Sequence, residues 1–450
     1  MNTPICDFVC RYAEADGLRL HMPGHKGIPL LGMEQMDITE IDGADNLYEA
    51  GGVIKQSEEN ASALFGTKTF YATEGCSQCI RGMLYLAVLY AKVCGKRPVI
   101  AVARNVHKTF LSAAALLDFD VVWLYPEQPD SYLSCKLDEA QLDTALSQLE
   151  EKPVAVYLTS PDYLGNVASI DSLAEVCHNH DCLLLVDNAH GAYLHFLQPP
   201  QHPIDLGADL CCSSAHKTLP VLTGGAYLHI AQGAPELFRE QAKNALMLFG
   251  STSPSYLILQ SLDAANRYLD DGYPQKLAAF VTQVEGLKEA LTAQGYILYG
   301  DEPLKLTVST KSYGYTGADF AQLLEDQGIV CEFYDPDFVV MMLTPQITRQ
   351  ALKKLEATLL SIPRKKAITQ APPAFHRCEA VMSVRQAMLS VGETVPVAES
   401  VGRVLAAASA GCPPAVPILV SGERIDAATV ACLSYYGMQT CTVVREVEGP

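Results

Sequence analysis

Short apolar segments alternate with amphipathic segments through much of the first half of the chain, beginning at Lys68. Apolar runs of this length predict strands that are buried on both faces, and the amphipathic segments between them predict the covering helices. This alternation restricts the fold to an α/β class with a mostly parallel sheet in the large domain. The predicted strands are 68–73, 98–104, 120–125, 154–161, 182–187, 206–212 and 224–230.

The regions on either side of this alternation have different patterns and predict separate domains. The chain divides into an N-terminal arm (1–55), a large domain (56–270), a smaller α/β domain (271–365) and a tail domain (366–450). The arm begins with a helix over 4–15 and continues into an irregular Gly- and Pro-containing loop. Strands of the smaller domain are predicted at 304–309, 328–333 and 338–343. The tail contains a Pro-rich crossing at 412–417.

Composition and charge exclude several classes of protein. The chain has 450 residues, of which 49% are hydrophobic and 18% charged, as in folded globular proteins. Its formal net charge of −19 argues against nucleic-acid binding. No apolar run is long enough to span a bilayer, and the N-terminus lacks the apolar core of a signal peptide. We therefore expect a cytoplasmic protein with no nucleic-acid partner and no membrane partner.

The 15 cysteines are scattered through the predicted core. In a cytoplasmic chain we expect them to be reduced and buried. Cys76 and Cys79 have CxxC spacing, and Cys177 to Cys182 encloses two histidines. Neither group has a second pair at the spacing of zinc sites. Cys177 should also end a helix where Cys182 begins a strand, so their side chains should diverge. The sequence thus predicts no metal site.

Two ionisable residues that follow predicted strands point to one cofactor. Asp187 ends strand 182–187, and Lys217 follows strand 206–212 on a predicted loop of small and apolar residues. Desolvation favours the neutral form of an amine, which imine formation requires. In enzymes that use pyridoxal 5'-phosphate (PLP), an acid pairs with the pyridine nitrogen and a lysine binds the aldehyde carbon. Singly, Asp187 could be a helix cap and Lys217 a surface lysine.

Further polar residues follow the predicted strands, at the edge where parallel sheets bind ligands. Gly75, Cys76 and Ser77 open a predicted helix, whose free N–H groups and dipole favour a phosphate. The other candidates at this edge are His107, His190, Ser214 and His216, and Thr252 in a later turn is a further donor. Their shared location predicts a single active site, although His107 could equally be a residue that starts a helix.

Several motifs resemble the Orn/Lys/Arg decarboxylase family, in the same order along nearly the whole chain. They are LHMPGHKG, the DNAHG segment, SSAHKTLP, STSPSYL and AESVGRVLAAASAGCPPAVPILVSGE. Members of this family are PLP enzymes of fold type I. The resemblance therefore implies a PLP-dependent transferase-like large domain followed by smaller α/β C-terminal domains. It is closest to the short members, which lack an N-terminal wing domain.

The resemblance also implies roles for individual residues. Lys217 resembles the lysine that binds PLP, Asp187 the acid at the pyridine nitrogen, and His107 the histidine stacked on the ring. Thr252 resembles a phosphate contact donated by a neighbouring subunit, which implies a homodimer with its active sites at the interface. Glu332 resembles a residue that meets the distal amine of the substrate. The implied contacts to the cofactor further include Gly75, Cys76, Ser77, His190, Ser214 and His216.

These observations predict a PLP-dependent decarboxylase that converts arginine, lysine or ornithine to CO₂ and a polyamine or polyamine precursor. Lys217 or His216 would return a proton to the α-carbon. The chain has Glu74-Gly75-Cys76 where the family more often has Asn-Gly-Ser/Thr, and Asn188 where it has Glu, which leaves the substrate open. Resemblance to the short members favours arginine. The alternatives are an aminotransferase, a sulfur-removing lyase or a non-catalytic family member.

Overall fold

The computed structural model describes residues 1–15, 17–127, 131–374, 377–407 and 415–446. Two compact units form the chain: Met1–Lys96 with Ile170–Ala278, and Arg97–Ser169 with Ala279–Pro450. The division into arm, large, small and tail domains follows the sequence pattern and stays a prediction. Part of the predicted Pro-rich crossing, 412–414, lies outside the described residues.

The first unit contains four strands in the order β1-β7-β6-β5. They are β1 (Lys68–Ala72), β5 (Leu183–Asp187), β6 (Leu210–Ser213) and β7 (Ala226–Ile230). Strands β5 and β6 are parallel, with Asp187 opposite Cys212, whereas β7 runs antiparallel to both β1 and β6. Nearly all residues of these strands are buried, which explains why the sequence shows continuous apolar runs.

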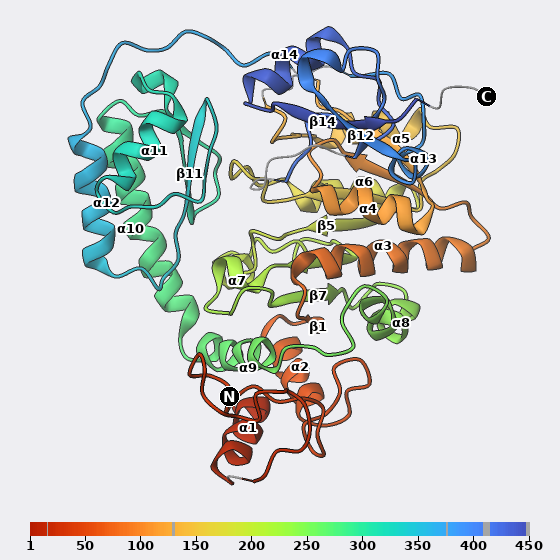
Figure 1. Ribbon diagram of the computed structural model, residues 1–450, viewed down its shortest axis with the longest axis vertical. Coiled ribbons are helices and arrows are strands. Elements are labelled where there is room, and N and C mark those ends of the chain that lie inside the picture. The colour runs from red at the N-terminus through yellow and green to blue at the C-terminus, as the bar shows by residue number, and fades with distance from the viewer. Residues whose placement is uncertain (16, 128–130, 375–376, 408–414, 447–450) are drawn as a thin grey trace. The chain divides into compact units, whose positions relative to one another are not determined.

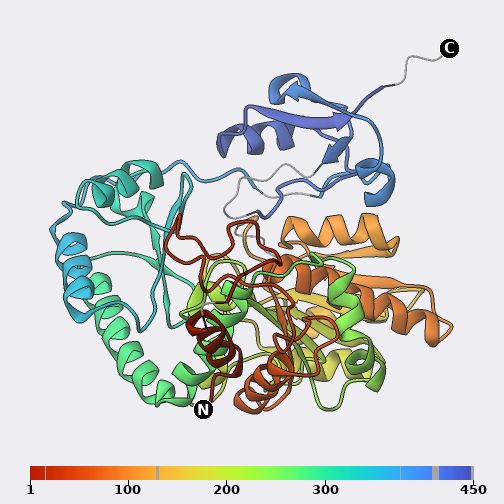
Figure 2. The ribbon, with the colours of Figure 1, turned by 60° about the horizontal axis from the view of Figure 1, so that its bottom comes forward.

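Helices cover this unit. They are α1 (Pro4–Glu14), α2 (Val53–Leu64), α3 (Gly75–Val93), α6 (Ile170–Asn179), α7 (Ala215–Thr218), α8 (Glu236–Met247) and α9 (Tyr256–Asp270), with a 3₁₀ turn η1 at Leu194–Phe196. Helix α3 packs on β6 and β7, and α1 packs against α2 and α9 (Figure 1). Residues 17–52 follow α1 as a long irregular segment, red in Figure 2.

A buried carboxylate of α9 holds the beginning of the arm. Asp263 Oδ2 accepts hydrogen bonds from the backbone N–H groups of Ile5 and Cys6 at 2.9 and 3.0 Å. Its other oxygen accepts from Ser57 Oγ at 2.6 Å. The first N–H groups of a helix have no partner within the helix and favour negative charge. Asp263 therefore caps α1 from a distant part of the sequence.

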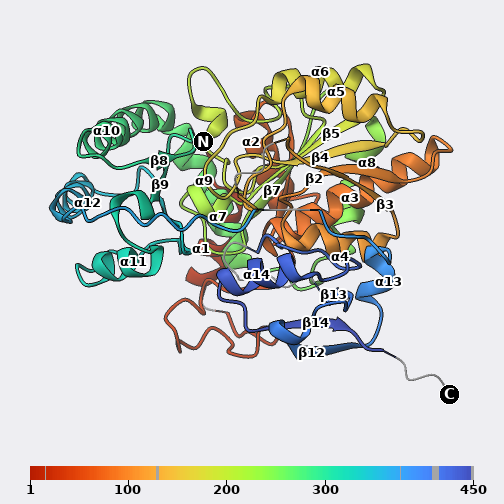
Figure 3. The same cartoon turned by 90° about the horizontal axis from the view of Figure 1, so that it is seen from above.

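The second unit begins with three parallel strands in the order β4-β2-β3 (Figure 3). They are β2 (Val99–Ala103), β3 (Asp120–Leu124) and β4 (Ala155–Thr159), with helices α4 (Lys108–Leu117) and α5 (Glu139–Ser147). Helix α4 connects β2 to β3, and α5 connects β3 to β4. Parallel neighbours require such a crossover connection.

Two smaller antiparallel sheets complete the second unit. The first has the order β10-β11-β9-β8 and the second β12-β14-β13. Their strands are β8 (Leu298–Tyr299), β9 (Lys305–Ser309), β10 (Phe333–Tyr334), β11 (Phe338–Met342), β12 (Gly392–Pro396), β13 (Leu405–Ala407) and β14 (Thr440–Val444). The helices are α10 (Tyr273–Ala293), which begins in the first unit, α11 (Gly317–Glu325), α12 (Arg349–Ser361), α13 (Val384–Met388) and α14 (Ala427–Tyr435), with 3₁₀ turns η2 (Lys311–Tyr313) and η3 (Val397–Glu399).

Three predictions of local structure are wrong. The strand predicted at 328–333 begins only at Phe333, because Gly328 is left-handed (φ +68°) and Ile329 N–H bonds Leu324 O to close α11. The strand predicted from 206 begins at Leu210, since a turn with Gly207 at φ +103° precedes it. Lys217 lies in the short helix α7 and not on a loop.

Candidate active site

Lys217 contacts a histidine from the segment that carries the predicted cofactor acid. Its Nζ lies 3.0 Å from Nε2 of His190, which is buried, while Lys217 is half-buried. Since β5 and β6 are parallel neighbours, the segments that follow them leave the same edge of the sheet. The structure thus brings Lys217 and His190 together, three residues beyond Asp187 along the chain.

Asp187 is buried, with 2% of its surface exposed. Its Oδ1 accepts a hydrogen bond from Ala189 N–H at 3.1 Å and one from Cys212 Sγ at 3.7 Å. A buried carboxylate needs such donors or a cation to offset its lost hydration. The contact with Cys212 was not predicted, because it depends on which strands are neighbours and in what register.

A second group of polar side chains holds the segment after Asp187. Asn188 Nδ2 donates to Ser213 Oγ at 3.0 Å, and His202 Nε2 lies 3.2 Å from the same oxygen. Burial lowers the pKa of His202 well below its usual value, so its ring is neutral. Asn188 N–H also donates to Cys212 O at 2.9 Å. These bonds tie the end of β5 to the end of β6.

Gly75 and His216 lie together beside the loop before β7. Gly75 is left-handed (φ +67°), and its N–H donates to Gly224 O at 2.7 Å. His216 Nδ1 lies 3.0 Å from Gly225 O, and burial lowers the pKa of this histidine. A Cβ built at Gly75 would lie 3.9 Å from His216 Cε1. These contacts place His216 at the start of α3, where the phosphate site is predicted.

The other predicted phosphate contacts differ in exposure. Ser77 is half-buried in the first turn of α3, and Ser214 is buried immediately before α7. Thr252 is exposed. The Cys76 thiol lies in a group with Asp187 and Cys212, so its side chain is directed toward the predicted acid.

The residues of this unit fit PLP. They offer an amine, a buried carboxylate and the N-terminus of a 19-residue helix for the aldehyde, pyridine nitrogen and phosphate respectively. Two buried hydroxyls, Thr73 Oγ1 and Thr218 Oγ1, have no hydrogen-bond partner within the described part of the chain. They adjoin the predicted phosphate loop and Lys217, where a polar ligand group would satisfy them.

His107 lies in the second unit and starts α4. Its Nδ1 accepts from Thr109 N–H at 3.2 Å and lies 2.8 Å from Thr109 Oγ1. The next residue, Lys108, donates its N–H to Ala415 O at 2.8 Å. His107 is thus a helix cap with a fixed ring, and its stacking on the cofactor stays a prediction.

Glu332, the predicted substrate residue, is exposed in the second unit. It accepts a hydrogen bond from Tyr163 Oη at 2.8 Å. It also lines a cavity of about 480 Å³ with Cys331, Met341 and Leu352. Its role toward a substrate stays a prediction.

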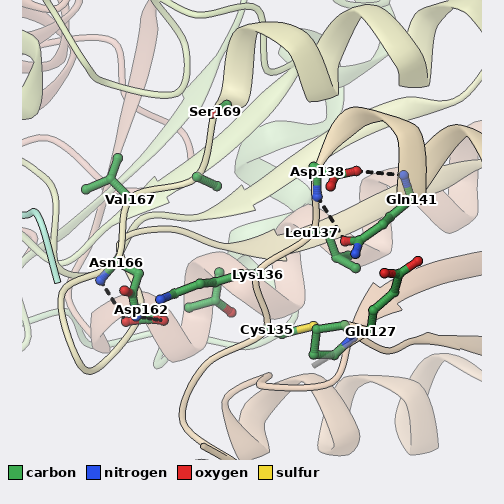
Figure 4. Close-up of a pocket in the computed structure, with 13 residues that line it drawn as sticks. Glu127, Cys135, Lys136, Leu137, Asp138, Gln141, Asp162, Asn166, Val167 and Ser169 are labelled. Carbon is green, nitrogen blue, oxygen red and sulfur yellow. Dashed lines mark hydrogen bonds between the residues drawn. The ribbon is translucent and has the colours of Figure 1, made fainter. Parts of the chain in front are cut away.

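A second cavity of the same unit, of about 410 Å³, follows the ends of β3 and β4 (Figure 4). Asp138 and Gln141 on its wall form a capping box for α5, and Asn166 Nδ2 donates to Asp162 Oδ2 at 2.8 Å. Lys136 points toward this Asp162–Asn166 pair (Figure 4). None of the predicted site residues lines this cavity.

Two family models match the chain, one over most of it and one over its C-terminal part. The model of the Orn/Lys/Arg decarboxylase major domain matches residues 3–299, and that of the C-terminal domain of the same family matches residues 366–444. The chain belongs to the Orn/Lys/Arg decarboxylase family. The predicted family, the enzyme class of PLP-dependent amino-acid decarboxylase and the cofactor are thereby confirmed.

Individual relatives cover almost the whole chain. An arginine decarboxylase of Halalkalibacterium halodurans is 30% identical over 96% of this chain and 92% of its own length. An arginine decarboxylase of Bacillus subtilis is 28% identical over 100% and 96%. The solved lysine decarboxylase of Francisella novicida is 16% identical, with a TM-score of 0.78 over 98% of this chain and 81% of that one. This likeness confirms the predicted fold class. Within the described residues, no helix combines the length and apolarity needed to cross a bilayer.

Proposed function

We propose that the protein decarboxylates arginine to CO₂ and agmatine, a polyamine precursor, with PLP held by Lys217 and Asp187. The observation that carries the proposal is the 3.0 Å contact between Lys217 and His190, three residues after the buried Asp187 along the chain and inside the matched major domain. Four relatives named arginine decarboxylase match at 26–30% identity, against 20% for one named lysine decarboxylase. This difference supports arginine among the three basic substrates.

PLP supplies an electron sink for the pair of electrons that the departing carboxylate leaves behind. Asp187 would keep the pyridine nitrogen protonated, since a buried carboxylate favours a cation beside it. Lys217 would bind the cofactor and, once released, could return a proton to the α-carbon. His190 Nε2 lies 3.0 Å from the amine of Lys217, and we propose that it takes up or supplies that proton. Its geometry favours it for this exchange over His216, whose Nδ1 faces Gly225 O.

The remaining residues would hold and orient the cofactor. Ser77 in the first turn of α3, together with Ser214 and His216 at the start of α7, would bind its phosphate, and His107 would cover its ring. The two buried thiols of Cys76 and Cys212 lie close to Asp187 and would help to keep water from its carboxylate. Exclusion of water strengthens the attraction between the acid and the protonated ring.

We further propose a homodimer in which Thr252 reaches the phosphate of the neighbouring subunit. Thr252 is exposed in the single chain. A residue that contacts a ligand of a second subunit must be exposed in this way before the subunits associate. The arm also exposes apolar side chains that a second copy would cover, among them Leu18, Leu20, Leu30 and Leu31, each at least 80% exposed. A cytoplasmic location likewise stays a prediction, which cell fractionation would test.

The first experiment is an absorbance spectrum of the purified protein with PLP, followed by CO₂ release from arginine, lysine and ornithine. We expect a visible band of bound PLP and CO₂ from arginine. Lys217→Ala and Lys217→Arg should both lack the band, because neither offers an amine that forms an imine. The exposed Lys276→Ala is the matched control and should keep it. A band without CO₂ from any of the three substrates would contradict the proposed reaction.

Subunit mixing tests the composite site. Lys217→Ala and Thr252→Glu should each be inactive when alone. Half of the dimers formed on random mixing are hybrids with one intact site of two, so activity should recover to about a quarter of the wild-type value. No recovery, with hybrids present by native mass spectrometry, would refute the shared site.

A further inference from the structure

The predicted cofactor acid and two buried cysteines form a group whose atoms could bind a metal ion. Cys76 lies in the first turn of α3, Asp187 ends β5, and Cys212 lies in β6. Their two Sγ atoms and a carboxylate oxygen all lie within 4.8 Å of one another. Each residue is at most 7% exposed. Because the three belong to different elements, the fold assembles this group and no sequence motif announces it.

The spacing of the atoms suits one small ion. Zn²⁺ binds thiolate sulfur at about 2.3 Å and carboxylate oxygen at about 2.0–2.2 Å in a tetrahedron, so its ligand atoms lie roughly 3.5–3.8 Å apart. Cys212 Sγ already lies 3.7 Å from Asp187 Oδ1. The Sγ atoms of Cys76 and Cys212 lie within 4.8 Å of each other. A contraction of about 1 Å at most would complete the three-ligand site.

The donor set also selects the class of cation. Two sulfurs and one oxygen favour zinc and cadmium, whereas Mg²⁺ and Ca²⁺ prefer oxygen ligands throughout. Three protein ligands leave the fourth tetrahedral position for a water molecule. Each thiol gives up its proton to the solvent as it binds, and no oxidant or reductant is required.

We propose that Cys76, Asp187 and Cys212 bind a zinc-class cation when PLP is absent, and that the cation and PLP exclude each other. Both need the same carboxylate: the metal as a ligand and the cofactor as the partner of its pyridine nitrogen. The inference rests on the proposed place of PLP at Asp187. Asp187 would thus have two alternative ligands, the cation and PLP. Free zinc would then oppose the binding of PLP to the enzyme.

The test titrates the full-length chain with Cd²⁺, whose thiolate complexes absorb in the ultraviolet. Protein freed of PLP should bind one Cd²⁺ that is sensitive to Cys76→Ser and Cys212→Ser, each of which should weaken binding at least tenfold. The matched control is Cys441→Ser, a buried cysteine of the second unit, which should bind as the wild type does. Circular dichroism of each variant separates loss of a ligand from loss of the fold.

The wild-type protein alone provides the decisive comparison. Loading with PLP should lower the apparent Cd²⁺ affinity at least tenfold, and Cd²⁺ added first should slow the appearance of the visible PLP band. Equal Cd²⁺ binding with and without PLP would overturn the inference, as would binding that ignores both cysteine substitutions. Either result, obtained with an intact PLP band and CO₂ release, would leave the proposed function standing.

Discussion

A buried ion pair between β2 and the tail allows a sharp test of how the second unit is held together. Arg104 follows β2 directly, and its guanidinium donates to Pro417 O at 3.1 Å and Ile418 O at 3.0 Å. It also lies 3.4 Å from Glu423 Oε2, with both side chains at most 5% exposed. Glu423 in turn accepts from Val420 N–H at 2.8 Å.

Arg104→Met would leave the buried carboxylate of Glu423 without this guanidinium. Removing one partner of a buried ion pair costs about 3–5 kcal/mol, since the remaining charge keeps its desolvation penalty. Removing both charges with Arg104→Met/Glu423→Leu should recover most of that loss. A residual cost of about 1–2 kcal/mol should remain, because two carbonyls lose their donor.

Urea unfolding followed by fluorescence provides the assay. Trp123 in β3 is the single tryptophan of the chain, and Arg104 Cζ lies 5.3 Å from its ring centroid. The signal therefore reports on the region that the substitution changes. The matched control is Arg97→Met at the other end of β2, where the exposed pairs with Asp120 and Glu151 should contribute under about 1 kcal/mol.

Two outcomes would refute this reasoning. One is that Arg104→Met lowers the free energy of unfolding by no more than Arg97→Met does. The other is a double variant as unstable as the single one, which would mean that lost packing and not the uncompensated charge of Glu423 determines the effect.

Three further substitutions have defined outcomes. His190→Phe should lower kcat by about 10- to 100-fold with the PLP band retained, because Lys217, which we propose binds PLP, loses a hydrogen-bond partner worth about 1.5–3 kcal/mol. Unchanged CO₂ release at saturating arginine would contradict this. Gly250→Ala should lower Tm, since its Cβ would lie 2.1 Å from Tyr48 Oη, whereas Gly286→Ala in α10, with open space around it, should not. Burial raises the pKa of Asp335 from 3.8 to about 6, so the native state binds this proton more tightly than the unfolded state does. The free energy of unfolding should therefore fall by about 2.4 kcal/mol as pH rises from 4 to 7. Asp335→Asn should flatten that dependence in urea titrations, and an unaltered slope would exclude this residue as the cause.

Much of the fold follows from local pattern. The predicted helix 4–15 is α1 (Pro4–Glu14), and the predicted strand 182–187 contains β5 (Leu183–Asp187). Both have a strong periodicity or a long apolar run that tertiary contacts reinforce. The prediction failed at 328–333, where apolar residues continue past the end of α11 but Gly328 and Ile329 close that helix instead. Apolar content alone cannot distinguish a helix cap from a strand.

Part of the candidate site could likewise be predicted from the sequence, and part could not. Asp187 and Lys217 were predicted as the PLP acid and lysine because each follows an apolar strand, and Lys217 stands among small and apolar residues. Their roles stay a prediction. The nearby Cys76 and Cys79 suggested a CxxC pair, yet the structure groups the Cys76 thiol with Cys212 and Asp187. Spacing along a chain predicts contacts only within one turn or helix, so it could not show this group.

The sequence by itself determined the alternation of strands and helices, the family, and the acid and lysine that we propose for PLP. Only the tertiary structure decided that Cys212 lies opposite Asp187, that β7 runs antiparallel to its neighbours, and that His190 meets Lys217. Burial and backbone preference act locally and leave a periodic trace in the residues. Strand order and register arise from packing between segments far apart in the chain, and that packing has no local pattern to read.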